Sequence, residues 1–144
     1  NISDNPDVTL PVPDTEGHFS VNKSYKEMQR ILTALQQQGF VSEGTTIDTF
    51  YYRMTGNGAP TQDRIIWVKR SSNREINLIS LVDFVVAMGV KLDEALSQIN
   101  RIFCRSDNSD INLSDDTKTK SRQRNRLCQS LSIYHEEIMN IIQE

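Results

Sequence analysis

The sequence predicts a mainly α-helical domain of about five helices with a minor two-stranded β pairing, on three observations. Its 144 residues are 37% hydrophobic and 24% charged, a composition typical of one globular domain with its own core. Apolar residues recur at three- and four-residue intervals over most of the chain, as on one face of a helix. Only residues 64–68 are dense in β-branched and aromatic side chains, and a strand there needs a partner strand.

The core is expected to form from residues 45–90. Six of the chain's ten aromatic residues lie between Phe40 and Phe84, and the longest apolar run falls in the same stretch. That run is shorter than the roughly 20 apolar residues of a transmembrane helix, so we predict no membrane partner. The expected centre of the core comprises Phe50, Trp67, Leu81, Val85 and Phe103.

Residues 1–20 are expected to form an extended acidic arm or linker ahead of a single helical domain at residues 21–144. The arm has four carboxylates and no lysine or arginine, and Pro6, Pro11 and Pro13 oppose helix formation. Of the 19 acidic residues, 15 remain after these four, against 16 basic ones. The total charge of the domain therefore favours no particular partner.

The first helix is expected over residues 24–38. Ser24 and Glu27 have the spacing of a capping box, and Gly39 supplies a left-handed stop. Its apolar stripe comprises Tyr25, Met28, Ile31, Leu32 and Leu35.

A shorter second helix is expected to begin at a cap on Thr45 or Thr46 and to reach Met54. Tyr52 and Arg53 lie off its buried stripe, which comprises Ile47, Phe50, Tyr51 and Met54.

The next elements alternate between helix and strand. A third helix is predicted over residues 74–88, with residues 71–73 as the turn that caps it, and a fourth over residues 92–103. Residues 110–113 alternate apolar and polar side chains, so we expect a short strand there that pairs with residues 65–68.

One long helix is predicted over residues 114–143. Apolar residues in its second half follow a 4-3-4-3 spacing, which is typical of a coiled-coil-like interaction seam. The seam comprises Leu127, Leu131, Tyr134, Ile138 and Ile141.

The first part of that helix holds five positive charges in nine residues, and these are the candidate DNA-contacting residues. They are Lys118, Lys120, Arg122, Arg124 and Arg126. Helical geometry spreads them around the helix, and Asp115 and Asp116 just upstream would repel phosphate. A solvated helix face is the alternative interpretation.

We predict no catalytic residue, no cofactor and no metal site. His135 lacks the second histidine of a zinc motif, because Met139 stands at that position, and we expect it to be a surface histidine. Cys104 and Cys128 have neither disulfide-framework nor metal-ligand spacing and are interpreted as thiols in a reducing compartment.

Two polar features are interpreted as structural. Asp83 lies within the most apolar helix and must be paired, with Arg53, Arg64 and Arg70 as candidate partners. Residues 108–112 resemble a calcium loop but lack its glycine and final glutamate, so an Asx-rich turn is expected.

A set of aromatic, glycine, proline and tryptophan positions resembles a known family. They are Gly39-Phe40-Val41, Thr49-Phe50-Tyr51-Tyr52-Arg53-Met54-Thr55-Gly56, Pro60, Ile65-Ile66-Trp67-Val68 and the run from Glu75 to Val86. Over residues 24–142 the chain is similar to the C-terminal half of RteC-type proteins, found on conjugative transposons of gut Bacteroidetes. The resemblance implies a DNA-acting regulator with a helix-turn-helix or winged-helix arrangement. The third helix is too apolar to lie in a DNA groove, so no DNA-contacting residue is carried across.

The leading functional hypothesis is a non-enzymatic accessory or regulatory domain of a bacterial protein, cytoplasmic, DNA-binding and linked to a mobile element. The alternative is a protein-interaction or oligomerisation module that uses the C-terminal helix, with itself or another protein. No small-molecule substrate is predicted.

Overall fold

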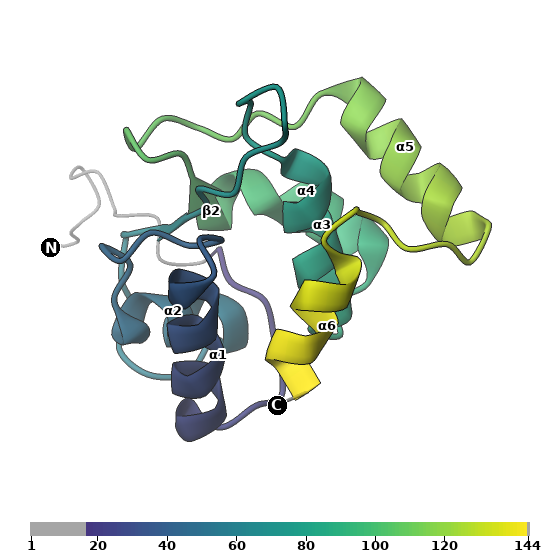
Figure 1. Cartoon of the computed structure of the whole chain (residues 1–144). Coiled ribbons are helices and arrows are strands. Elements are labelled where there is room, and N and C mark those ends of the chain that lie inside the picture. Colours follow the sequence, from purple (N-terminus) through teal and green to yellow (C-terminus); the bar gives the residue numbers. More distant parts are fainter. Residues whose placement is uncertain (1–16, 144) are drawn as a thin grey trace, which may run out of the picture.

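Residues 17–143 are described in the computed structural model, and within them the chain forms six helices and a two-stranded parallel sheet (Figure 1). This confirms the mainly α class with a minor β pairing. The elements are α1 (Tyr25–Gln37), α2 (Ile47–Thr55), β1 (Ile65–Ile66), α3 (Leu78–Ala87), α4 (Leu92–Ile102), β2 (Phe103–Cys104), α5 (Asp115–Arg126) and α6 (His135–Gln143). Among the helices of this range, none has the length and apolar character needed to cross a membrane.

Most of the predicted acidic arm lies outside the described residues, which begin at Gly17. The described end of the arm belongs to the domain, because Phe19 is fully buried and its N–H donates to the Arg53 carbonyl oxygen at 2.8 Å. The N–H of Val21 donates in the same way to the carbonyl oxygen of Met54, at 2.9 Å. The packed domain therefore begins before Val21.

Local capping sets the starts of α1 and α2, as predicted. The Ser24 hydroxyl accepts from the Glu27 N–H, and the Glu27 carboxylate accepts from the Ser24 N–H, both at 3.2 Å. The latter hydrogen bond holds the pKa of Glu27 below its usual value. Thr46 caps α2, since its hydroxyl accepts from the Thr49 N–H at 3.2 Å.

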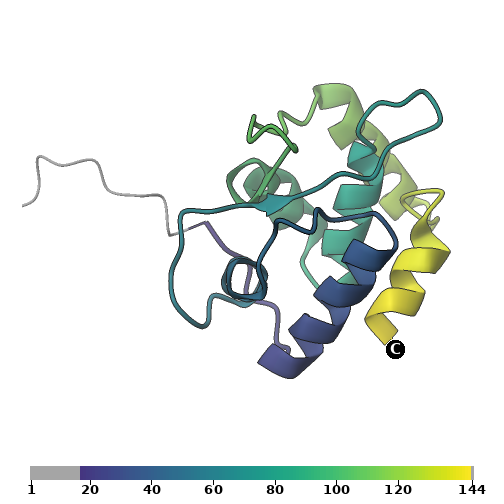
Figure 2. The same ribbon diagram turned by 60° about the vertical axis from the view of Figure 1, so that its left-hand side comes forward.

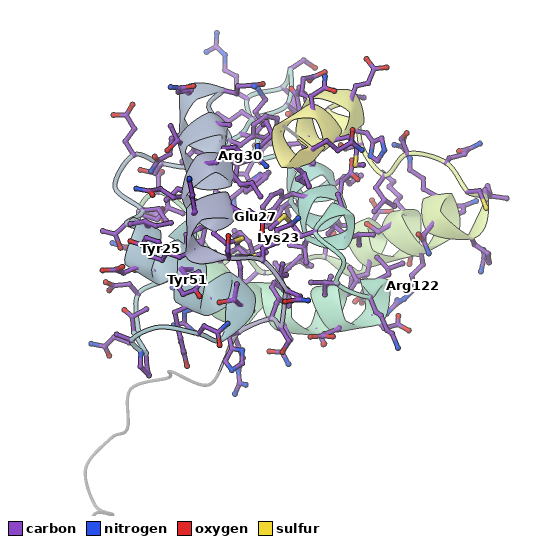
Figure 3. The ribbon with its side chains drawn as sticks, turned by 90° about the horizontal axis from the view of Figure 1, so that it is seen from below. Lys23, Tyr25, Glu27, Arg30, Tyr51 and Arg122 are labelled. Carbon is purple, nitrogen blue, oxygen red and sulfur yellow. The ribbon has the colours of Figure 1, made fainter. Side chains whose placement is uncertain are left out.

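The buried faces of α1 and α2 differ from the prediction most clearly at three residues, and the predicted Ile47 and Tyr51 are only partly buried. Tyr25 was expected in the core but is 41% exposed; its ring packs edge-on against Tyr51, with centroids 5.1 Å apart (Figure 3). Tyr52 and Arg53 were expected off the buried stripe but are buried. The segment before α1 covers their side of α2, and the apolar spacing of the helix itself carries no sign of that cover.

The core is centred on α3, which packs against α4, α5 and α6 inside the domain (Figure 2). The Trp67 ring lies against Phe40, Phe84 and Phe103, with centroid distances of 5.7, 5.7 and 6.1 Å. Tilted and edge-on aromatic contacts of this kind add stabilisation beyond the area they bury. The five predicted core residues are all fully buried, which confirms the expected centre of the core.

The partner of the first strand is not the predicted one. β1 pairs in parallel with β2, so that Ile65 lies beside Phe103, which was expected at the end of a helix. The helices α3 and α4 form the crossover that a parallel pair requires. In the predicted strand at residues 110–113, Asp110 makes an isolated bridge to Cys104.

The third helix begins later than predicted, at Leu78. Residues 70–76 instead form a hairpin, closed by a bridge between Arg70 and Ile76. The side chain of Asn73 accepts from the N–H two residues ahead, which stabilises the turn rather than a helix start. Asn77 is the actual cap, because its side chain accepts from the Ser80 N–H at 2.9 Å.

Replacing Asn77 with alanine is expected to lower the free energy of unfolding by about 1 kcal/mol, the usual cost of losing a helix cap. The matched variant Asn73→Ala removes the exposed turn side chain and should change it by less than about 0.5 kcal/mol. Urea unfolding of both variants measures this difference. A larger loss for Asn73→Ala would contradict the position of the cap.

The predicted long final helix was wrong, because the chain breaks between Arg126 and His135. Cys128 has a left-handed backbone, with φ of 59°, which no helix can continue. Arg124 stabilises the break by donating to the carbonyl oxygen of Leu131 at 3.0 Å. The polar composition of α5 also leaves it without an apolar face that could run on into α6.

The predicted interaction seam is therefore not a continuous surface. Leu131, Ile138 and Ile141 are buried in the core of their own domain, and the Tyr134 ring packs edge-on against Phe40. Leu127 is 59% exposed and lies beyond the end of α5. The residues of the seam thus serve mainly to pack α6 against the rest of the chain.

Candidate functional site

The helix α5 lies at the edge of the domain, and Ser121 is its one buried residue (Figure 1). Ser114 caps it, with the hydroxyl accepting from the Thr117 N–H at 3.1 Å. Asp115 and Asp116 occupy its first turn, where the helix dipole favours negative charge. The local sequence therefore accounts for a stable helix whose other side chains are available to solvent.

The five candidate cations of α5 form two rows rather than one stripe. Residues four apart share a helix face, so one row contains Lys118, Arg122 and Arg126 and the other contains Lys120 and Arg124. Arg122 projects from α5 on the opposite side of the molecule from α1, with its Nε 3.6 Å from Asp93 Oδ1 (Figure 3).

The other cations of α5 differ in what holds them. The Lys120 ammonium is 3.0 Å from a carboxylate oxygen of Asp116. Exposed pairs such as this one and the Arg122 pair contribute about 0–1 kcal/mol and yield readily to a competing phosphate. Arg124 is held by the backbone instead, because its side chain donates to the carbonyl oxygens of Ser130 and Leu131 after the helix.

A pocket of about 420 Å³ separates α5 from the hairpin at residues 70–76, and we name it the α5 groove. Its lining includes the apolar side chains of Ile76, Leu78, Ile79 and Ile133. Lys120 and Arg124 line the α5 side, while the hairpin carries the exposed Arg70 and Arg74. The backbone of the hairpin is fixed by a 2.8 Å hydrogen bond from Arg70 to the Arg74 carbonyl oxygen. The hairpin lines the groove with Ser71, Asn73, Glu75 and Ile76, so the cations of the lining come from α5 alone.

The pair α3 and α4 has the form of a helix-turn-helix but not the surface of one. A short turn at Gly89 joins them, as in such motifs. However, α3 is buried over Ser80–Val85, and the first exposed turn of α4 carries Asp93 and Glu94. Neither helix offers a basic face to a phosphate backbone, which leaves α5 as the exposed basic helix of the described chain.

The partners of Asp83 differ from those predicted. The Ser132 hydroxyl donates to Asp83 Oδ2 at 2.7 Å, and His135 Nδ1 lies 2.9 Å from Oδ1. His135 is therefore not a simple surface histidine, and Asp83 is paired with it rather than with Arg53, Arg64 or Arg70. The carboxylate stands between the serine and the histidine, so the imidazole is not placed to activate the hydroxyl as in a nucleophilic triad.

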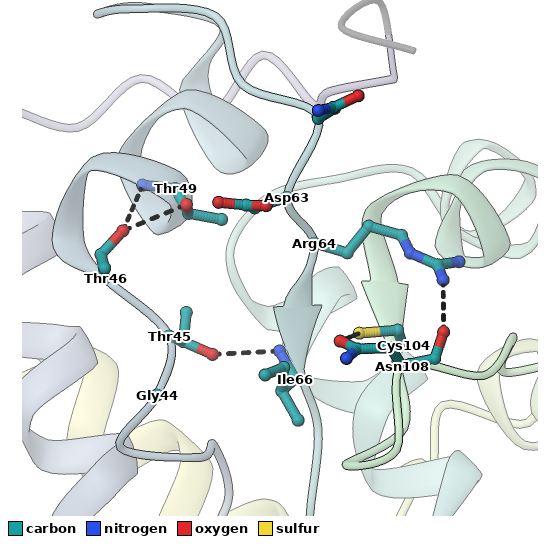
Figure 4. A pocket seen from close by; sticks show the side chains of 10 residues that line it. Gly44, Thr45, Thr46, Thr49, Asp63, Arg64, Ile66, Cys104 and Asn108 are labelled. Atoms are coloured by element: carbon teal, nitrogen blue, oxygen red, sulfur yellow. Dashed lines mark hydrogen bonds between the residues drawn. The ribbon is translucent and has the colours of Figure 1, made fainter. Parts of the chain in front are cut away.

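A second pocket, of about 510 Å³, lies between the start of α2 and the sheet (Figure 4). Thr46 and Thr49 hydrogen-bond to each other at its edge, and the Thr45 hydroxyl accepts from the Ile66 N–H at 3.1 Å. Cys104 lines the pocket, and burial raises the pKa of its thiol. A raised pKa lowers the thiolate fraction of a cysteine and with it the reactivity of the thiol.

The loop between β2 and α5 contains the expected Asx turn. The Asp107 carboxylate accepts from the Ser109 N–H at 3.0 Å and from its hydroxyl, and these hydrogen bonds lower the pKa of Asp107. Across residues 17–143, no three histidine, cysteine, aspartate or glutamate side chains gather as metal ligands would.

Sequence reasoning missed the buried position of Arg53 and the hairpin beside α5. A buried arginine has no sequence signal of its own, because arginine is ordinarily exposed. No family model, curated protein or solved structure matches this chain. The resemblance to RteC-type proteins accordingly stays a prediction.

Proposed function

We propose that this chain is a non-enzymatic, DNA-binding accessory or regulatory domain that holds the phosphate backbone with α5 and the adjacent hairpin. The observation that carries the proposal is the exposure of α5, a helix with several cations and a single buried residue. Core packing does not account for these charges, whereas phosphate binding requires them.

The exposed position of α5 at the edge of the domain gives the proposal its geometry. An α-helix fits the major groove of B-DNA, which is about 12 Å wide. With α5 in or along that groove, the hairpin cations Arg70 and Arg74 are available for phosphates beside it, as the wing of a winged helix is. Asp115 and Asp116 repel phosphate from the first turn, so the contacts are assigned to the later turns, which hold Arg122 and Arg126.

The finer assignment rests on the resemblance to RteC-type proteins. It suggests a bacterial, cytoplasmic regulator linked to a mobile element. The alternative, a module that associates through the C-terminal helix, has less support, since Leu131, Ile138 and Ile141 pack inside the domain.

The double variant Arg122→Gln/Arg126→Gln tests the proposal. We expect its affinity for a mixed-sequence duplex to fall by on the order of tenfold. The slope of log affinity against log salt concentration should also become less steep, by the amount that corresponds to about two phosphate contacts. The control Lys26→Gln/Lys91→Gln removes the same charge from exposed positions on other elements. Fluorescence anisotropy of a labelled duplex measures both. An equal loss in the two variants would mean that α5 is not the binding surface.

A further inference from the structure

The hairpin at residues 70–76 has one edge that the domain contacts and one that it leaves open. Arg70 and Ile76 form its bridge, and hydrogen bonds of 2.8 Å between their neighbours close it on both sides. In this pattern the backbone N–H and C=O groups of the bridged pair point away from each other's strand. The Tyr134 hydroxyl, just before α6, donates to the Arg70 carbonyl oxygen at 3.0 Å. Among residues 17–143, no group donates to or accepts from the backbone of Ile76, so this edge is open.

The open edge belongs to the α5 groove. Residues 75–79 all line the groove, and its volume of about 420 Å³ is within the usual range of ligand pockets. Ile133 lines it as well and, at 74%, is the most exposed large apolar side chain of the described residues. An unpaired strand edge beside exposed apolar side chains offers the two kinds of contact that an added strand makes, to the backbone and to alternate side chains.

The charges of the groove select the chemistry of a partner. Its lining contains Lys120 and Arg124 from α5 and Glu75 from the hairpin, which leaves one positive charge in excess. The lysine is already 3.0 Å from Asp116, which lies outside the lining. Arg124 donates to backbone carbonyls through Nη1 alone, and its Nε and Nη2 have no partner within residues 17–143. Neutral carbonyls orient a guanidinium group without cancelling its charge, so a carboxylate is the complementary group at the α5 wall.

We propose that the α5 groove binds an extended segment of a partner protein, which adds a strand to the hairpin at Ile76. Main-chain hydrogen bonds to Ile76 hold the segment, an aliphatic side chain packs on Ile133, and a carboxylate pairs with Arg124. This site is distinct from the DNA contacts of the proposed function, which are assigned to Arg122 and Arg126 in the other row of α5.

The test is selection of a random peptide library on the full chain, followed by fluorescence anisotropy of the most enriched peptide. We expect valine or isoleucine to alternate with other residues in the enriched peptides, together with at least one aspartate or glutamate. In an added strand, only alternate N–H groups face the neighbouring strand. N-methylation of those positions should weaken binding by at least about tenfold, and N-methylation of the other positions should change it little.

Two variants of the chain locate the peptide. Ile133→Ser and Lys120→Glu should each weaken binding by about tenfold, because they remove the exposed apolar contact and reverse a charge of the lining. The matched controls Leu127→Ser and Lys26→Glu make the same changes outside the lining and should leave the affinity unchanged. All four side chains are exposed, so the fold is retained in each variant.

Several outcomes would overturn the proposal. One is the absence of enriched peptides, and another is N-methylation that has the same effect in both registers. A dimeric mass that Ile133→Ser converts to a monomer would assign the groove to a second copy of the chain. A loss of duplex DNA affinity in Ile133→Ser, without a loss of peptide affinity, would assign it to DNA.

Discussion

Replacing Ile138 with alanine is expected to reduce the free energy of unfolding by about 3 kcal/mol, while Leu127→Ala changes it by less than about 0.5 kcal/mol. Ile138 is fully buried where α6 packs against α3, so truncation leaves a cavity. Leu127 is 59% exposed past the end of α5 and has little packing to lose. Urea unfolding at neutral pH compares the two.

This pair of variants separates two short helices from one long one. In a continuous helix that associates through a seam, both residues would face the same partner and both truncations would weaken the assembly. Similar losses for the two variants, with a dependence on protein concentration, would contradict the break between α5 and α6. A large loss at Ile138 alone is the outcome that the packing of α6 predicts.

The second large effect is expected at the pair between Asp83 and His135. His135→Ala should cost about 2 kcal/mol, because it leaves a 2% exposed carboxylate without the hydrogen bond to the imidazole. The exposure of the imidazole, 37%, keeps the loss below that of a fully buried pair. The neighbouring Glu136→Ala removes an exposed side chain and serves as the control.

A double-mutant cycle isolates the contact. In the background of Asp83→Asn there is no buried charge to compensate, so His135→Ala should cost at least about 1 kcal/mol less than it does alone. Thermal unfolding of the four proteins gives the coupling energy. Additive losses would show that the histidine contributes through packing and not through the carboxylate.

Elements with a local cause could be predicted from the sequence. Ser24 and Glu27 satisfy each other within one turn, and Thr46 caps a helix that ends at the left-handed Gly56. The core residues Trp67 and Phe103 could also be predicted, because large apolar side chains are usually buried in a globular domain.

Elements decided by distant residues could not be predicted. The start of α6 is held by a distant residue, Asp83, which is 49 residues from Ser132 and 52 from His135 in the sequence. Without that contact in view, the 4-3-4-3 spacing of apolar residues favoured one long helix. The pairing of β1 with β2 was also hard to predict from the sequence, because the apolar Phe103 fits the last turn of α4 as well as it fits a strand.

The candidate site divides in the same way. The basic run was visible as composition, and helical periodicity alone places Lys118, Arg122 and Arg126 in one row. That the hairpin at residues 70–76 faces Lys120 and Arg124 across one groove is a tertiary fact, because α3 and α4 separate the two segments in the sequence.

The most direct test of DNA binding is the affinity of the unmodified chain for a mixed-sequence duplex between low and moderate salt. Three to five phosphate contacts by α5 and the hairpin predict a log–log slope of about −2.7 to −4.5. We therefore expect the chain to bind the duplex at low salt and to lose affinity steeply as the salt concentration rises. Absence of binding at low salt, or binding that salt leaves unchanged, would contradict it.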